Sequence, residues 1–506
     1  MIISINKADK TPYYLQISMA IKKKIMEGVL LDGFVLPSER ELAKLIGVHR
    51  NTVTKAYNEL KSEGLVISSH GIGYRILFGL HENAAVSNTT GSNKANEKSK
   101  ATKNTKQKGV HWESIIKDEY LHFESSFDDL YSKSYDTGSI SFAGGISSPS
   151  VYLKKDISAS IHQMLSHTQG KSYFHTPYGG DLTLRKHLAS FLHGKGMAAD
   201  PTDIQIFSEM NQALDFLVTL LLKPGDTVIT EEPLSPDVYR TIKLAGGKII
   251  SIPLDDDGML CDHLGPLIEK HKPRFIYVNS SFQDPTGTTL SLARRRLLLD
   301  LSYQYRIPLI EEDAASDLQY SGPYCPRMKA MDKGNNVIYI YSFSLTFVPG
   351  VSIAFVAGPR TLIDSLANLV SIRLVSLDWL SQKLLAQAFE TNLYYDKLRV
   401  FQEEYRKKME RMCGWLDRMK SMGVTYRRPD GGVYIWCKLP EGMNTKRFFH
   451  DMEQEGVSFV PGTVFYPDNN RGNDHFRLNF SYPAPEQIDS GMKRIYEYIL
   501  AHKKTL

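Results

Sequence analysis

The stretch YSFSLTFVPGVSIAF, residues 341–355, lies inside a longer segment, 337–358, that contains no charged residue. A charge-free run of this length is long enough to cross a membrane as a helix. Its serines, its threonine and the central Pro349-Gly350 pair favour two buried strands joined by a turn instead, because proline interrupts a helix. The segment therefore predicts inner strands of a sheet and no transmembrane span.

The composition indicates a globular protein of two or three domains. The chain has 506 residues, of which 42% are hydrophobic and 23% charged, with a net charge of +5. This mild basic bias neither requires nor excludes a nucleic-acid partner. Residues 1–10 lack the apolar core of a secretory signal, so we expect a cytoplasmic protein. The cysteines fit a reducing compartment and show no metal-ligand spacing, so no metal site is expected: Cys261, Cys325, Cys413 and Cys437.

From about residue 111 onward, apolar strands alternate with helices. This alternation predicts a largely parallel α/β sheet that is covered on both faces. The part after about residue 390 has long charged helices and separate strands, and it predicts a smaller α/β subdomain. The expected strands are 203–207, 227–231, 248–254, 274–281 and 308–312, and the expected helices include 212–222 and 292–305.

Residues 1–79 form a separate unit with helical periodicity. Ile17, Ile21 and Ile25 make an apolar stripe, and Ser38 with Glu41 forms the capping-box pattern of a second helix. A third helix carries apolar residues at helical spacing, and a short hairpin follows over 65–68 and 74–77. Residues 80–110 are instead rich in Asn, Ser, Thr and Lys, and they predict a flexible linker. Its lysines are better explained by solvation than by DNA phosphate contact.

The first unit resembles the winged helix-turn-helix of GntR-type bacterial regulators. The resemblance is carried by the segments Tyr14–Ile17, Leu36–Ala43, Gly47–Val53, Ala56–Leu60, Glu63–Leu65 and the Gly71/Gly73 wing. It implies binding to double-stranded DNA, with a recognition helix that starts near residue 49. The residues that we expect to touch DNA are Arg40, His49, Arg50, Asn51, Thr52, Lys55, His70 and Gly71. The alternative is that Arg40 pairs with a neighbouring glutamate and Arg50 only caps its helix.

Residues 111–506 resemble the fold-type I aminotransferase domain that follows such a winged helix in MocR-type regulators. The motifs that carry the resemblance occur in family order: Pro224-Gly225-Asp226, Pro285-Thr286-Gly287, Gly431-Gly432, Pro461-Gly462 and the run 476–481. In the family, residues 341–355 would carry the lysine that binds pyridoxal phosphate. Leu345 stands at that lysine position, and an alkyl side chain cannot form a Schiff base.

Other positions of the cofactor shell also depart from the family pattern. Ser352 replaces the phosphate-binding arginine, Ser235 the stacking aromatic residue, and Asp284 the asparagine before Pro-Thr-Gly. With an ambiguity of one residue, Glu312 replaces the aspartate at the ring nitrogen and Ala314 the tyrosine. The phosphate loop reads Ser208-Glu209-Met210, in which glutamate replaces glycine. We therefore expect no covalently bound pyridoxal phosphate.

Arg477 is an exception, because it occupies the position at which relatives hold a substrate carboxylate. Two interpretations are open. Either it recognises a small carboxylate effector, or it pairs inside the protein with Glu312, Asp313 or Asp284, since a buried arginine needs a partner.

The sequence thus predicts a homodimeric, DNA-binding transcription regulator whose aminotransferase-like domain is catalytically inactive and serves dimerisation or effector sensing. The alternatives are a pyridoxal-phosphate-dependent aminotransferase, a pyridoxal-phosphate-sensing regulator, and a purely structural dimerisation module.

Overall fold

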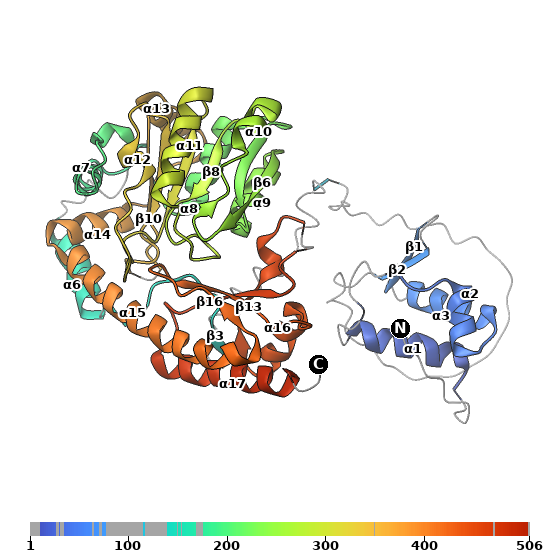
Figure 1. Ribbon diagram of the computed structural model, residues 1–506. Coiled ribbons are helices and arrows are strands. Elements are labelled where there is room, and N and C mark those ends of the chain that lie inside the picture. Colours follow the sequence, from blue (N-terminus) through green and yellow to red (C-terminus); the bar gives the residue numbers. More distant parts are fainter. Residues whose placement is uncertain are drawn as a thin grey trace. The chain divides into compact units, whose positions relative to one another are not determined.

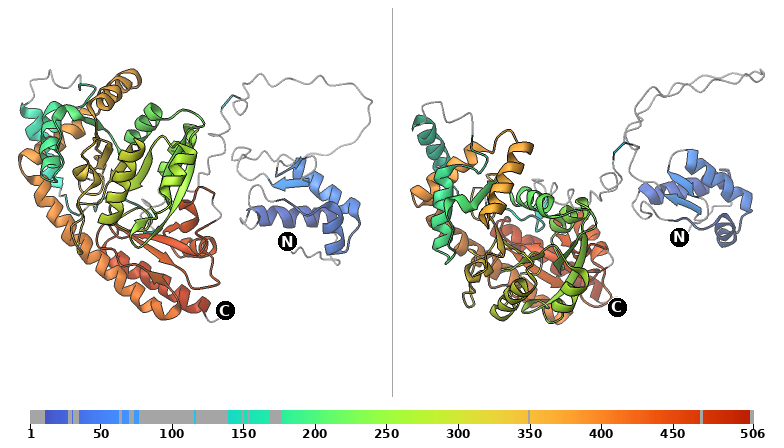
Figure 2. Two further views of the ribbon diagram at one scale, coloured as in Figure 1. Left: turned by 45° about the horizontal axis from the view of Figure 1, so that its top comes forward. Right: turned by 90° about the horizontal axis from the view of Figure 1, so that it is seen from above.

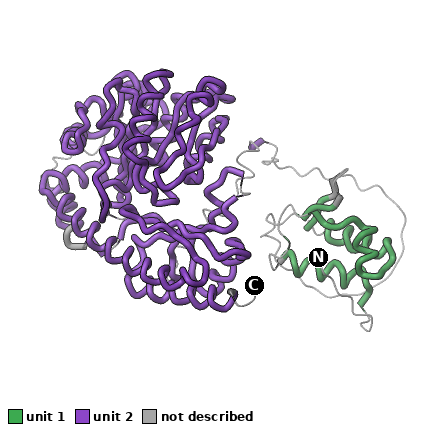
Figure 3. Tube along the Cα trace, in the orientation of Figure 1, with its two compact units in different colours: residues 1–109 green, residues 110–506 purple. Residues whose placement is uncertain are grey.

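The computed structural model describes residues 11–26, 30, 35–62, 65–69, 73–76, 115–116, 139–148, 150–152, 154–167, 176–348, 350–468 and 471–503. The chain divides into two compact units, residues 1–109 and 110–506 (Figure 3). The predicted linker, 80–110, lies outside the described residues. The two units are described separately below.

The N-terminal unit contains three helices and a two-stranded hairpin. Its elements are α1 (Tyr13–Met26), α2 (Glu39–Ile46), α3 (Arg50–Ser62), β1 (Val66–Ser69) and β2 (Gly73–Ile76), the two strands being antiparallel. The predicted isoleucine stripe of α1 is fully buried, and it packs with Val53, Ala56, Tyr57 and Leu60 of α3. The unit therefore has a core of its own, as the helical periodicity predicted.

Helix α2 begins and ends as the sequence predicted. The Ser38 hydroxyl accepts a hydrogen bond from the Glu41 amide at 3.3 Å, and the Glu41 carboxylate accepts one from the Ser38 amide at 3.0 Å. Gly47 ends the helix in the left-handed conformation, with φ +69°. Glycine suits this position because a side chain would strain that backbone conformation.

The large unit is built on an eight-stranded sheet with the order β4-β11-β10-β9-β8-β5-β6-β7. Among these strands, β11 runs antiparallel to both of its neighbours and β7 to β6, while the central strands are parallel. The strands are β4 (Ile204–Phe207), β5 (Thr227–Glu232), β6 (Lys248–Asp255), β7 (Gly258–Met259), β8 (Ile276–Asn279), β9 (Leu309–Asp313), β10 (Val337–Ser342) and β11 (Ala354–Ala357). The charge-free segment forms β10 and β11, which confirms the prediction of two buried strands.

Helices cover both faces of this sheet (Figure 1). Successive strand residues point to opposite faces, so Tyr277 packs on one helical layer while Ile276 and Val278 pack on the other. The first layer contains α8 (Met210–Leu221), α9 (Pro236–Leu244) and α13 (Arg360–Arg373). The second contains α10 (Leu264–His271), α11 (Leu292–Tyr305) and α12 (Met328–Met331). The expected two-sided α/β sheet is confirmed.

The C-terminal subdomain has an antiparallel sheet of its own, with the order β12-β13-β16-β15. Helices α15 and α17 lie side by side along it in Figures 1 and 2. Its elements are α15 (Leu393–Met419), β12 (Thr425–Tyr426), β13 (Tyr434–Lys438), α16 (Thr445–Gln454), β14 (Val457–Ser458), β15 (Val460–Pro461), β16 (His475–Asn479) and α17 (Pro485–Lys503). Strand β14 pairs in parallel with β3 (Ile140–Ser141). The large unit also contains the helices α6 (Lys154–His167), α7 (Leu182–His193) and α14 (Trp379–Glu390). Within the described residues, no helix is both long and apolar enough to span a bilayer.

The capping box of α2 generates a stability prediction. Replacing Ser38 with alanine removes one of the two reciprocal bonds, so we expect α2 to lose roughly 0.5–2 kcal/mol of stability. Amide hydrogen exchange on the full-length protein measures this loss as faster exchange of the α2 amides. The control is Ser62→Ala at the exposed end of α3, which leaves α2 unchanged. Equal exchange of α2 in both variants would contradict the capping role.

Candidate functional site

The N-terminal unit presents its predicted DNA-contact residues at the start of α3 and on α2. The side chains of Arg40, His49, Arg50, Asn51 and Lys55 are exposed, and Thr52 is half-buried. A helix that reads bases does so from side chains near its N-terminus, which is where four of these residues lie. His70 and Gly71 of the wing lie outside the described residues.

Arg50 is held by an ion pair across the helix-turn-helix. Its Nε and Nη2 atoms donate to Oε2 of Glu39 at 3.0 and 2.8 Å. The predicted alternative placed a glutamate against Arg40, whereas the structure places Glu39 against Arg50. The Arg50 side chain remains 53% exposed, and an exposed pair of this kind contributes about 0–1 kcal/mol. The pair therefore orients Arg50 without removing it from a DNA partner.

In the large unit, the predicted cofactor positions meet in one cavity of about 460 Å³. The cavity lies where the parallel strands end and α8 begins, which is the usual ligand position in an open α/β sheet. Eight of the nine positions line it, and Ser208 does not. The eight are Glu209, Met210, Ser235, Asp284, Glu312, Ala314, Leu345 and Ser352.

The strand register removes the ambiguity over β9. Glu312 and Ala314 line the cavity, whereas Asp313 between them is fully buried on the other side of the strand. Side chains alternate along a strand, so only every second residue can face the cavity. The acid at the ring-nitrogen position is therefore Glu312.

Glu312 has an unusual electrostatic environment. Burial away from water, together with the nearby carboxylates of Asp237 and Asp313, raises its pKa to about 8. Its Oε1 accepts a hydrogen bond of 3.3 Å from the Asn279 side chain. Glu231, whose carboxylate accepts from the Asn279 amide at 2.8 Å, also has its pKa raised to about 8 by burial. Near pH 7, burial therefore favours the protonated, neutral forms of Glu231 and of Glu312, of which Glu312 lines the cavity.

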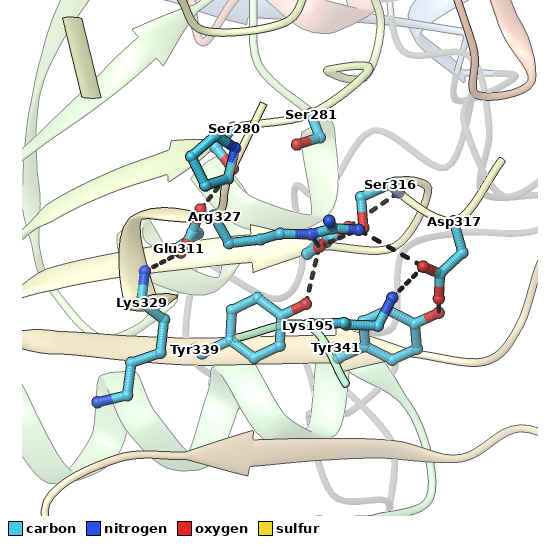
Figure 4. Close-up of polar contacts among 12 residues, drawn as sticks. Lys195, Ser280, Ser281, Glu311, Ser316, Asp317, Arg327, Lys329, Tyr339 and Tyr341 are labelled. Atoms are coloured by element: carbon cyan, nitrogen blue, oxygen red, sulfur yellow. Dashed lines mark hydrogen bonds and ion pairs between the residues drawn. The ribbon is translucent and has the colours of Figure 1, made fainter. Parts of the chain in front are cut away.

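Behind the cavity, the other two acids of β9 belong to a buried polar network (Figure 4). Asp313 accepts from Tyr339 at 2.7 Å and pairs with Arg327 at 3.4 Å, and these partners keep its pKa below the usual range. Lys195 and Tyr341 meet at Asp317, which also pairs with Arg327 (Figure 4). This network joins β9, β10 and the end of α7, so we assign it a structural role.

The phosphate end of the cavity lacks positive charge. The amide of Ser208 donates to the Gln212 side chain at 2.9 Å, and Glu209 begins α8 without capping it. No Lys, Arg or His occurs among the described residues that line the cavity. Pyridoxal phosphate requires an amine, a phosphate site and an ionised partner for its ring nitrogen. Leu345 offers no amine, and Glu209 and Ser352 offer no positive charge to a phosphate, so the lining does not fit the first two of these requirements.

Arg477 is fully buried in β16 and paired inside the protein. Its Nη1 donates to Asp284 at 2.6 Å and its Nη2 to the carbonyl oxygen of Ala143 at 2.8 Å. The guanidinium also lies over the rings of Tyr434, at 4.2 Å, and Phe465, at 5.0 Å. Of the two interpretations of Arg477, the structure contains the internal pair, and a carboxylate effector would have to displace Asp284.

Six polar residues that line the cavity are absent from the predicted positions: Asn211, Asp237, Asn279, Ser342, Ser344 and Tyr434. Asn279 is the last residue of β8, and polar residues at the carboxyl ends of parallel strands are the expected ligand contacts. That signal was available in the sequence. Asp237 in α9 and Tyr434 in β13 reach the cavity only through the packing of their elements.

Known proteins match both units of the chain. Residues 13–76 match the family described as bacterial regulatory proteins, gntR family, and residues 149–495 match aminotransferase class I and II. The HTH-type transcriptional regulator YisV of Bacillus subtilis is 27% identical over 97% of both chains. Aromatic-amino-acid aminotransferase 1 of Thermococcus litoralis is 30% identical over 72% of this chain and 89% of its own. The solved structure of LysN, an α-aminoadipate aminotransferase of Thermus thermophilus, has a TM-score of 0.72 at 26% identity, over 78% of this chain and all of its own.

The raised pKa of Glu312 predicts a pH-dependent stability. The folded state keeps the proton up to about pH 8, whereas the unfolded chain releases it near the usual value of 4.5. Folding stability therefore falls as pH rises through this window. Glu312→Gln removes the penalty, so we expect the variant to exceed the parent in stability by roughly 1–3 kcal/mol at the upper end of the window and little at the lower end. Denaturant unfolding across the window, with exposed Glu441→Gln as control, measures the difference. A difference that does not change with pH would refute the assignment.

The exposed Arg50 predicts a specificity effect. Arg50→Ala should weaken binding to a specific DNA site by roughly 1–3 kcal/mol and relax sequence preference. The reason is that the guanidinium group can no longer donate two hydrogen bonds to the edge of a base. Glu39→Gln removes the ion pair but keeps Arg50, so its specific affinity should stay near that of the parent. Lys55→Ala should weaken all sequences alike and reduce the salt slope by about one unit. Band-shift titrations at two salt concentrations distinguish these outcomes, and unchanged affinity in Arg50→Ala would contradict base reading.

Proposed function

Since the chain belongs to the MocR type of GntR-family transcription regulators, in which a winged helix-turn-helix is joined to a class I and II aminotransferase domain, we propose that its aminotransferase domain is non-catalytic and serves as a dimerisation and effector-sensing module. The observation that carries the proposal is the lining of the cavity. Leu345 stands there at the position expected for lysine, and no amine from another described residue lines the cavity. Because it acts on bacterial DNA, the regulator works in the cytoplasm.

Several changes support the loss of cofactor chemistry independently of the lysine position. Ser352 cannot neutralise a phosphate, and Ser235 offers no ring for stacking. These two changes affect phosphate binding and ring stacking separately. A pyridoxal-phosphate-sensing regulator, the main alternative, would need at least one of these functions to remain.

A homodimer is supported by apolar side chains that the single chain leaves exposed. Ile372 at the end of α13 and Val375 just after it are 80% and 91% exposed. Large apolar residues that lie together on a surface are typical of a protein contact. In the proposed dimer, two recognition helices are presented to one operator, which raises the apparent affinity through effective concentration.

Absence of a covalent cofactor is the direct test of the non-catalytic module. The purified protein, incubated with pyridoxal phosphate and reduced with borohydride, should show no internal-aldimine absorbance and no phosphopyridoxyl group on a peptide that lines the cavity, because Leu345 has no amine. An aminotransferase with an intact lysine, treated in parallel, is the positive control. A phosphopyridoxyl-lysine peptide from the cavity would refute the proposal.

Removal of the large unit tests the dimerisation role. A fragment without residues 111–506 retains the separate core of the N-terminal unit, so we expect it to fold, to be monomeric and to bind DNA weakly. Analytical ultracentrifugation and band shifts on a two-site operator compare it with the intact protein. If the fragment binds that operator as tightly as the full chain, the large unit is not the dimerisation module.

A further inference from the structure

The cofactor-like cavity has a charge pattern opposite to that of a phosphate site. Four acidic residues line it, and no basic residue does so among the described lining residues. An anion such as a phosphate or a carboxylate would therefore meet like charge, whereas a cation would be attracted. The acidic lining residues are Glu209, Asp237, Asp284 and Glu312.

These acids are not equivalent. Asp284 is neutralised by Arg477 at 2.6 Å, so it offers little charge to a ligand. Glu312 has no ion pair with any described residue, and the amide of Asn279 is its hydrogen-bond donor. Glu312 is therefore the lining acid whose charge, once the group ionises, is available to a cationic ligand.

A buried acceptor lies beside Glu312. Asn279 is 8% exposed and lines the cavity, and its Oδ1 atom has no hydrogen-bond partner within the described part of the chain. A buried acceptor left without a donor costs free energy, and native proteins satisfy nearly all such groups. A donor that enters the cavity would satisfy this oxygen. Together with the carboxylate of Glu312, the oxygen defines a site for an N–H group that carries positive charge.

The other walls of the cavity suit an alkyl chain. Met210, Leu214, Val238 and Leu345 contribute apolar surface next to the polar end. The volume of about 460 Å³ lies within the range of small-molecule pockets, about 300–1,000 Å³. A small ligand with a charged end and a methylene chain matches both parts of the lining.

We propose that this cavity binds a protonated aliphatic amine, whose ammonium group is held by the Glu312 carboxylate and the Asn279 side-chain oxygen, as the effector of the regulator. The proposal rests on the effector-sensing part of the proposed function and specifies its ligand class. Recognition requires no covalent step, because the amine is bound as an ion and not converted.

Binding of an amine should be coupled to loss of a proton. Glu312 is protonated near neutral pH in the free protein, and an ammonium ion favours its ionised form. Affinity should therefore rise between about pH 6 and about pH 8, where an aliphatic amine remains protonated. Among the described residues, the charged groups that act on Glu312 are acidic, and they oppose its ionisation: Asp237 of α9, Asp313 of β9 and Glu231 of β5.

Isothermal titration of the full-length protein with three four-carbon probes tests the proposal. Butane-1,4-diamine should bind, and its neutral and anionic analogues, butane-1,4-diol and succinate, should not. Glu312→Gln should weaken diamine binding about tenfold or more, because one charge-assisted contact is lost while the shape is kept. Glu441→Gln, an exposed acid outside the cavity, is the matched control and should bind like the parent.

The outcomes separate this proposal from the proposed function. Diamine binding that is lost in Glu312→Gln, kept in Glu441→Gln and stronger at the higher pH supports the cation site. The cation site is refuted if the diamine does not bind, if Glu312→Gln binds it as well as the parent does, or if succinate binds better. None of these outcomes bears on the proposal that the aminotransferase domain is non-catalytic. A borohydride-trapped pyridoxal adduct overturns the proposed function itself.

Discussion

Three consecutive carboxyl groups in the central strand β9 constrain the large unit: Glu311, Glu312 and Asp313. A parallel sheet that is covered on both faces excludes water, so each acid must be paired or neutral. The carboxylate of Glu311 accepts hydrogen bonds from the backbone amides of Met328 and Lys329 at the start of α12. Its Oε1 atom lies 3.6 Å from Nη1 of Arg295. Asp313 pairs with Arg327, the residue before α12, and accepts a hydrogen bond from Tyr339 of β10. These contacts fix α12 and β10 against β9.

Glu312 is the acid for which the fold provides no cation, and this decides the character of the cavity. In an aminotransferase, a cofactor with a protonated ring nitrogen would supply the positive charge at this place. Here the residues around Glu312 are acidic or neutral, so the group stays protonated until the solution is mildly alkaline. At the position where aminotransferases hold an anionic cofactor, the described lining of this cavity thus consists of acidic and neutral residues.

The pairing of Arg477 with Asp284 belongs to the same change in charge. A buried arginine without a carboxylate partner would be an unbalanced charge. Asp284 supplies the carboxylate permanently, and the aromatic rings of Tyr434 and Phe465 enclose the guanidinium. The scaffold therefore keeps its arginine while the site loses its opening for a carboxylate. In the N-terminal unit, the ion pair between Glu39 and Arg50 differs, because it is exposed and easily exchanged for a DNA contact.

The sequence alone determined the architecture, because that information is local and periodic. The isoleucine stripe, the capping box of α2, the alternation of strands and helices and the charge-free strand pair each depend on residues close together in the chain. Motifs in family order then placed Leu345, Ser352 and Glu209 at the positions of a cofactor shell. Eight of the nine such positions do lie around one cavity.

Only the tertiary structure decided the electrostatics of that cavity. Which of Glu312 and Asp313 faces the ligand depends on strand register, and a shift of one residue reverses it. Asp284, the partner of Arg477, lies 193 positions away from it in the chain. The side-chain oxygen of Asn279 is a candidate ligand contact only because folding buries it without a hydrogen-bond donor. Such properties arise from distances between side chains on different elements and from exclusion of water, and neither is written in the order of residues along a single segment.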